Sequence, residues 1–179
     1  MIDTSLSIRD NFDSYIQRIV EFTQGFSVGP DDVRVGAVVY NTTGTLLFTL
    51  DELMTGAEVS STISSVPGPN GMTNYAAAFR VTRTQVLVPP GDRPSVPNVC
   101  IFFTDGKPSK EQENTTSEAA LLRPLCTLIM VSIGNSPNQT QLMELSTDNR
   151  VFSTTFDLLD SIRSNLTNSV CEFAPGKNT

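Results

Sequence analysis

The chain contains no histidine, and only three of its 179 residues are cysteines. The absence of histidine removes the commonest general base, the Ser-His-Asp and Cys-His catalytic arrangements and the commonest metal ligand. The cysteines, Cys100, Cys126 and Cys171, stand far apart without a Cys-x-x-Cys pair, which argues against a structural zinc site. These absences favour a binding or structural protein over an enzyme.

Clustered basic residues and long apolar runs are also missing. The formal net charge is −7, and the scattered Lys and Arg residues form no patch for phosphate groups, so we expect no nucleic-acid partner. No apolar run approaches the roughly 20 residues that span a bilayer, so we expect no membrane insertion. An apolar fraction of 39% spread along the whole length predicts one folded domain with its own core.

Helix-like and strand-like patterns alternate along the chain. Apolar residues recur at helical spacing from Ile8 to Phe26, with Ser7 as the expected N-cap. Two β-branched runs on either side of Asn41-Thr-Thr-Gly44 predict a hairpin over 33–50. Further helices are expected over 51–65, 73–88, 109–122, 137–145 and 155–170, and further strands over 98–104, 125–133 and 151–152. This order predicts an α/β fold, doubly wound in the Rossmann manner, in which helices cover both faces of a mostly parallel sheet with one antiparallel edge strand.

Three short polar segments stand at strand ends or helix starts. They are Asp3-Thr4-Ser5-Leu6-Ser7, Gly71-Met72-Thr73 and Thr104-Asp105-Gly106. In a doubly wound sheet such loops converge on the edge where ligands bind. Two carboxylates and three hydroxyls suit Mg²⁺, Mn²⁺ or Ca²⁺ rather than zinc. Taken singly, the first segment is more typical of a helix cap with a solvated acid, and the other two are also compatible with an N-cap and a turn.

Together, the three segments resemble the metal-ion-dependent adhesion site of von Willebrand factor type A domains. The match combines an Asp-x-Ser-x-Ser segment, a Gly-x-Thr segment about 65 residues further on and an apolar strand that ends in Thr-Asp-Gly. It extends over nearly the whole chain, from Asp3 to about Cys171. Residues 1–172 are therefore expected to form the domain, and 173–179 a polar tail or linker.

The resemblance implies a role for each matching residue. Ser5 and Ser7 would ligate Mg²⁺, or alternatively Mn²⁺ or Ca²⁺, through their hydroxyls. Thr73 would bind directly or through water, while Asp3 and Asp105 would act mainly through water and hydrogen bonds. Two acids leave a dication with a net positive field, so an Asp or Glu from a partner protein would complete the coordination shell.

Two departures from the family pattern stand out. Only Met1 and Ile2 precede Asp3, so the first strand, which is central in this family, is expected to be truncated. Because each large side chain of that strand would contribute about 1.5–3 kcal/mol on burial, we expect the chain to be marginally stable. Met72 stands where the family commonly has glycine and is expected to influence the choice of partner.

Compartment is inferred from sequons and from one cysteine. Candidate N-glycosylation sites occur at Asn41, Asn114, Asn138 and Asn165. We expect Cys100 and Cys126 to be free buried thiols. Family resemblance implies that Cys171, placed just after the last helix, pairs with a cysteine upstream of Met1. These features favour an extracellular location, either secreted or in the ectodomain of a surface protein.

The leading hypothesis is a cation-dependent adhesion or matrix-assembly module that binds an acidic residue of an extracellular protein, with collagen or another matrix protein as candidates. The alternative is a structural matrix domain that binds its partners without using the metal. An intracellular assembly role is a further alternative. A phosphatase with an aspartate nucleophile would need a second Asp where Ser5 stands, so we expect no enzyme.

Overall fold

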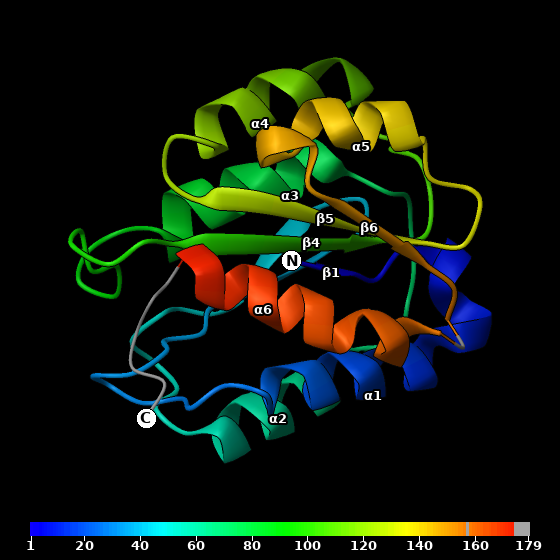
Figure 1. Cartoon of the computed structure of the whole chain (residues 1–179). Coiled ribbons are helices and arrows are strands. Elements are labelled where there is room, and N and C mark those ends of the chain that lie inside the picture. Colours follow the sequence, from blue (N-terminus) through cyan, green and yellow to red (C-terminus); the bar gives the residue numbers. More distant parts are fainter. Residues whose placement is uncertain (157, 174–179) are drawn as a thin grey trace.

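A mixed six-stranded sheet forms the middle layer of the computed structural model (Figure 1). The structure describes residues 1–156 and 158–173, and at 160, 163, 171 and 173 it describes the backbone alone. Hydrogen bonding assigns two three-stranded sheets, β1-β2-β3 and β4-β5-β6. Met1 joins them, because its amino group donates to Ile101 O at 2.7 Å and Phe103 N donates to Met1 O at 3.1 Å. The strands therefore follow the order β3-β2-β1-β4-β5-β6, and only β3 at one edge is antiparallel to its neighbour. Their bounds are β1 Ile2–Asp3, β2 Ala37–Tyr40, β3 Gly44–Phe48, β4 Val99–Thr104, β5 Thr127–Ile133 and β6 Val151–Thr154.

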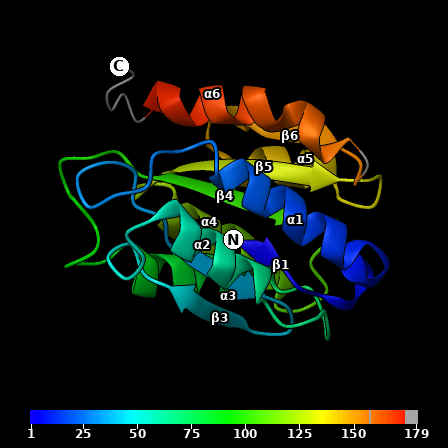
Figure 2. The ribbon, with the colours of Figure 1, turned by 90° about the horizontal axis from the view of Figure 1, so that it is seen from below.

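Helices cover both faces of this sheet, as Figures 1 and 2 show. One face carries α1 (Phe12–Thr23), α2 (Gly56–Ser64) and α6 (Arg163–Phe173), and the other carries α3 (Tyr75–Val81), α4 (Thr115–Leu122) and α5 (Gln139–Leu145). Short helices complete the chain: η1 Leu6–Asn11, η2 Thr82–Val86, η3 Gln112–Asn114, η4 Thr147–Asn149 and η5 Leu159–Ile162. The predicted α/β class, sheet type and two-sided covering are confirmed.

Two apolar clusters, one on each face, hold the layers together. Successive strand residues point to opposite faces, so Phe102 and its neighbour Phe103 serve different clusters. Phe102 stacks on Tyr40 with ring centroids 4.8 Å apart on the α3 side. Phe103 meets Tyr15 of α1 edge-to-face at 6.4 Å on the other side. The continuous apolar run of β4 is thus explained by burial on both faces.

Several helix boundaries differ from the predicted ones because capping residues set them. The helix predicted over 51–65 begins at Gly56, since Thr55 and Glu58 form a capping box. The helix predicted from Thr73 begins at Tyr75, and Asn74 is its N-cap. Ser7 is not an N-cap but lies within η1, the 3₁₀ turn that precedes α1. The strand predicted over 33–40 is shorter and starts at Ala37.

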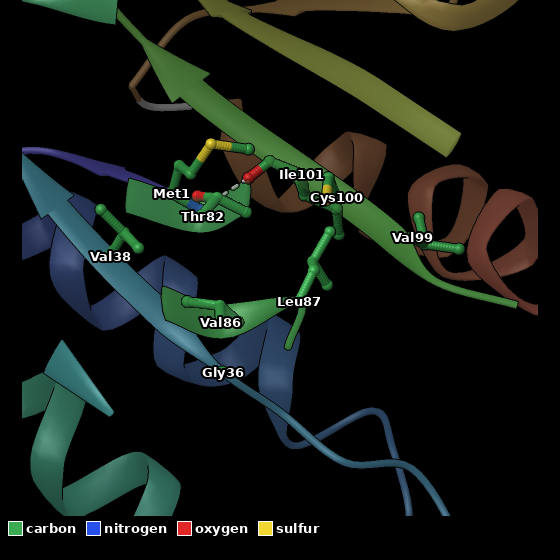
Figure 3. A pocket seen from close by; sticks show the side chains of 9 residues that line it. All are labelled: Met1, Gly36, Val38, Thr82, Val86, Leu87, Val99, Cys100 and Ile101. Carbon is green, nitrogen blue, oxygen red and sulfur yellow. Dashed lines mark hydrogen bonds between the residues drawn. The ribbon is translucent and has the colours of Figure 1, made fainter. Parts of the chain in front are cut away.

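The first strand is central and only two residues long. Ile2 pairs with Val39 and Asp3 with Tyr40 in parallel register. Beside Met1, a cavity of about 60 Å³ lies between β2, β4 and η2 (Figure 3). Apolar side chains form most of its lining, which also includes Thr82, whose buried Oγ1 has no hydrogen-bond partner among the described residues. Marginal stability of the chain stays a prediction.

The prediction that Cys100 and Cys126 are free thiols is wrong. They form a disulfide with Cα atoms 5.9 Å apart. Cys100 lies in β4 and Cys126 directly precedes β5, so the parallel pairing of these strands brings the two side chains together. Cys171 lies inside α6 rather than after the last helix. Its side chain and residues 174–179 lie outside the described part of the chain, so the Cys171 pairing and the polar tail stay predictions.

Candidate metal site

The three predicted segments meet at the carboxyl edge of the sheet. Asp3 ends β1, Thr104 ends β4, and the segment ending in Thr73 leads into α3. Backbone hydrogen bonds tie the loop after β1 to the loop that ends at Thr73, from Asn70 N to Thr4 O at 2.9 Å and from Leu6 N to Gly71 O at 3.2 Å. Gly71 adopts φ +73°, a conformation that favours glycine, and this turn sets the path of the Gly-x-Thr segment.

A chain of side-chain hydrogen bonds links residues at opposite ends of the sequence. Ser5 Oγ lies 3.1 Å from Ser7 Oγ, and Ser7 Oγ donates to Asp105 Oδ1 at 2.7 Å. The turn from β1 into η1 brings both hydroxyls to one point, as the Asp-x-Ser-x-Ser spacing predicts. Hydroxyl and carboxylate oxygens gathered in this way form the donor set that hard divalent cations prefer.

Asp3 lies behind these hydroxyls and is fully buried. Its Oδ1 accepts a hydrogen bond from Ser5 N at 2.9 Å, and its Oδ2 lies 3.1 Å from the Tyr40 hydroxyl and 3.2 Å from Thr104 Oγ1. Burial raises the pKa of Asp3 to about 6, although its hydrogen bonds oppose the shift. Because both oxygens already have partners, Asp3 is placed to orient the Ser5 loop and to supply negative charge.

Asp105 faces the same point from β4 and is 9% exposed. Burial raises the pKa of this carboxyl, and the hydrogen bond from Ser7 opposes that rise. No salt bridge among residues 1–156 and 158–173 involves Asp3 or Asp105. Two buried acids without a basic partner therefore concentrate negative potential where a cation would bind.

Thr73 lies on the adjoining loop and is nearly buried. Its N–H donates to Ser109 Oγ at 3.0 Å, and its carbonyl accepts from the N–H groups of Ser109 and Lys110. Among the described residues, no hydrogen bond joins the Thr73 hydroxyl to the Ser5-Ser7-Asp105 chain. The structure thus brings four of the five predicted ligands into one network, formed by Asp3, Ser5, Ser7 and Asp105, and holds the fifth beside it through its backbone.

Several supporting residues were not predicted. The hydroxyls of Tyr40 and Thr104 contact Asp3, and Asn74 holds the Thr73 loop. Asn74 Oδ1 accepts from Ala77 N, while its Nδ2 donates to Thr42 O and to Glu111 Oε1. An Asn directly before a helical pattern is a recognised N-cap signal, so Asn74 could have been found from the sequence. The tyrosine contact depends on strand pairing and has no local signal.

The donor chemistry fits a hard dication. The described residues contain no group of three or more His, Cys, Asp or Glu side chains that could hold a metal. Serine hydroxyls and two carboxylates are left, which suits magnesium, manganese or calcium better than a soft metal. The ligand role of each residue stays a prediction.

The four sequons lie in different surroundings. Asn138 and Asn165 are exposed, and the Asn138 side chain caps α5. Asn41 is half-buried, with its Nδ2 donating to Thr4 Oγ1 at 3.4 Å, and Asn114 is half-buried directly before α4. Attachment of glycans at any of them stays a prediction.

The fold is a doubly wound α/β domain in which hydroxyl and carboxylate oxygens gather at the carboxyl edge of the sheet. Residues 1–165 match the model of the von Willebrand factor type A domain family, and the chain belongs to that family.

Similar proteins agree with this family. Von Willebrand factor A domain-containing protein 1 of Danio rerio is 30% identical over 96% of this chain and 35% of its own length. The collagen alpha-6(VI) chain of Homo sapiens is 30% identical over 96% of this chain and 8% of its own length. Proximal thread matrix protein 1 from the mussel byssus was solved with a zinc-occupied MIDAS (metal-ion-dependent adhesion site) motif. It shares the fold with TM-score 0.84 and 24% identity, over 95% of this chain and 44% of that one. The chain spans about a third or less of the length of these two curated relatives.

The relatives also indicate the compartment. Collagen chains are matrix proteins, and the domain is extracellular. No helix in the described part of the chain is long and apolar enough to cross a membrane.

Proposed function

We propose that this domain binds an extracellular protein through a divalent cation held at the Ser5-Ser7-Asp105 cluster. The observation that carries the proposal is the hydrogen-bonded chain from Ser5 Oγ through Ser7 Oγ to Asp105 Oδ1, with buried Asp3 directly behind it. The match to a family with a solved, metal-occupied MIDAS relative supports the same conclusion. We propose no catalytic role.

In this proposal, each residue has a distinct task. Ser5 and Ser7 present hydroxyl oxygens as direct ligands, and Thr73 contributes directly or through water. Asp3 and Asp105 supply charge and orient the hydroxyls through hydrogen bonds and water. Mg²⁺ is the proposed cation, with Mn²⁺ and Ca²⁺ as alternatives, and it would supply an electrophilic centre for a carboxylate.

The partner is proposed to offer an Asp or Glu side chain. Two carboxylates that act mainly through water leave a dication electrophilic and its coordination shell incomplete, since hard cations take six or more oxygens. An exposed carboxylate of a collagen or another matrix protein fits this requirement, and the collagen relative makes a matrix partner the natural candidate.

Calorimetric titration of the chain with Mg²⁺, Mn²⁺ and Ca²⁺ tests the cation site. We expect saturable binding by the wild type and its loss in Ser7→Ala and Asp105→Ala. Asp10→Ala is the matched control, because Asp10 is an exposed acid on the same 3₁₀ turn whose ion pair with Arg9 contributes little. Equal binding by wild type and Asp105→Ala would overturn the assigned site.

A second experiment separates cation-dependent adhesion from structural binding. Immobilised collagens and other matrix proteins are probed with the chain in magnesium and in chelator. Binding that disappears in chelator and in Asp105→Ala supports the proposal. Binding that survives both treatments would favour the structural alternative, in which the metal plays no part.

A further inference from the structure

Two large apolar side chains are exposed on the loops that carry the proposed ligands. Leu6, between Ser5 and Ser7, is 51% exposed, and Met72, directly before Thr73, is 45% exposed. Single exposed apolar residues are common on protein surfaces. These two lie on loops that are hydrogen-bonded to each other through Leu6 N and Gly71 O, so they flank the cation site together.

A second loop beside the site is basic. Lys107 and Lys110 are both exposed, and they are two of only three lysines in the sequence. This loop abuts the proposed ligands, because Lys110 N donates to Thr73 O and a Cβ at Gly106 would lie 3.8 Å from Ser7 Oγ. Neither lysine takes part in a salt bridge within the described part of the chain.

The nearby acids leave these lysines available. Arg80 binds Glu111 at 3.0 Å, and Asn74 also donates to the Glu111 carboxylate. Arg80 and Arg83 both bind Glu118. Of the acids close to these two lysines in the sequence, Glu113 on η3 is the one that is exposed to solvent. Leu6, Met72, Lys107 and Lys110 form the rim of the site. In a chain of net charge −7, the two lysines of this rim favour an acidic partner surface.

We infer that the domain recognises an acidic residue of a partner protein that has a large aliphatic or aromatic residue and a second acid beside it. The inference rests on the proposed function, since the central acid would complete the cation shell. The apolar neighbour would cover Leu6 and Met72, and the second acid would approach Lys107 and Lys110. The specificity thus comes from the rim and the affinity for carboxylate from the cation.

Synthetic peptides in magnesium buffer test the inference. One peptide is acetyl-Gly-Leu-Glu-Glu-Gly-amide, and the reference is acetyl-Gly-Ala-Glu-Ala-Gly-amide. Peptide affinity is measured by calorimetry in saturating magnesium for every variant, after calorimetry has measured its Mg²⁺ affinity, and the ¹³C-methyl NMR signals of Leu6 and Met72 report peptide contact in the wild type. Partial burial of one leucine against the apolar rim corresponds to about ten-fold tighter binding, so we expect at least that preference for the first peptide.

The variants separate the rim from the cation site. Leu6→Ser combined with Met72→Ser should remove most of the preference, and Lys107→Gln combined with Lys110→Gln should reduce it, while Mg²⁺ affinity changes by less than about two-fold. The matched apolar control is Leu121→Ser with Met143→Ser, whose side chains are 53% and 45% exposed on α4 and α5. Lys177→Gln, at the third lysine, is the charge control.

Each outcome decides one question. Normal Mg²⁺ binding with equal affinity for the two peptides, or with no detectable peptide binding, would overturn the rim inference and leave the proposed cation site standing. A preference that survives the Leu6 and Met72 changes, or that falls equally in the controls, would also overturn it. Absence of Mg²⁺ binding by the wild type would overturn the proposed function, and this inference with it.

Discussion

Replacing Asp3 with asparagine is expected to stabilise the metal-free chain at neutral pH and to weaken cation binding. Asp3 is fully buried, and its oxygens contact Ser5 N and the hydroxyls of Tyr40 and Thr104. An asparagine keeps the acceptor for Ser5 N, and its NH₂ group can donate to either hydroxyl oxygen. The change therefore removes a buried charge without leaving a buried polar group unpaired.

The magnitude follows from the pKa of Asp3, which burial raises from 3.8 to about 6. Between these two pH values the folded chain holds the proton more tightly than the unfolded chain, so the free energy of unfolding falls as pH rises. The pKa difference corresponds to about 3 kcal/mol, all of it lost above about pH 6. Since asparagine carries no such penalty, we expect the variant to be about 2–3 kcal/mol more stable at pH 7 and little different near pH 4.

Urea unfolding in chelator between about pH 4 and 8 measures this difference. The Met1 amino group has the opposite effect. Burial lowers its pKa from 8.0 to about 5, so its contribution to the free energy of unfolding rises with pH between these two values. That contribution is common to both proteins, so the difference between them isolates Asp3. A variant that is less stable at every pH, or a difference that does not change with pH, would refute the reasoning.

Magnesium should remove most of this difference in stability at pH 7. A ligand that binds only the folded state adds about 2.7 kcal/mol at a concentration of 100 times its Kd. The wild type should gain this increment and Asp3→Asn should gain little. Equal gains by the two proteins would show that Asp3 has no part in the cation site.

Three further changes test the scaffold. Replacing Cys100 and Cys126 with alanine should cost about 3.5 kcal/mol in urea unfolding, because their disulfide closes a sequence separation of 26 residues; no loss would argue that the bond does not form. Thr82→Val should raise the free energy of unfolding by about 1 kcal/mol, since the buried Thr82 Oγ1 has no partner; an unchanged value would indicate that water in the adjoining cavity satisfies it. Gly71→Ala should cost about 1–2 kcal/mol from its φ of +73° alone, and a Cβ there would also meet Thr42 Oγ1, which accepts from Met72 N; thermal unfolding and Mg²⁺ titration should both show the loss, and unchanged values would contradict it.

The order of elements could be predicted from the sequence because burial on one or both sheet faces leaves a regular pattern. Val99–Thr104 is almost wholly apolar because Phe102 and Phe103 enter different cores. Helix starts were less accurate where a cap decided them. The Thr55-x-x-Glu58 signature was present and would have placed α2 correctly.

The clustering of the predicted site residues could be predicted from the sequence, but the residues that support them could not. The spacing of Asp3, Ser5 and Ser7 is local, so a motif captures it. The contact of Tyr40 with Asp3 requires the parallel pairing of β1 with β2, and the disulfide requires the pairing of β4 with β5. Such pairings depend on tertiary packing, and no short stretch of sequence around Tyr40, Cys100 or Cys126 carries them.

The absence of a basic partner for Asp3 within the described residues agrees with the proposed cation binding. A lysine or arginine placed at Tyr40 or Thr104 would lower the pKa of Asp3 and stabilise the isolated chain, but its charge would repel a dication a few ångströms away. Hydroxyl groups hold the carboxylate without cancelling its charge. The nearby lysines, Lys107 and Lys110, instead face solvent, where they can attract an acidic partner. The same buried acid that destabilises the metal-free chain therefore provides the potential that would hold the cation.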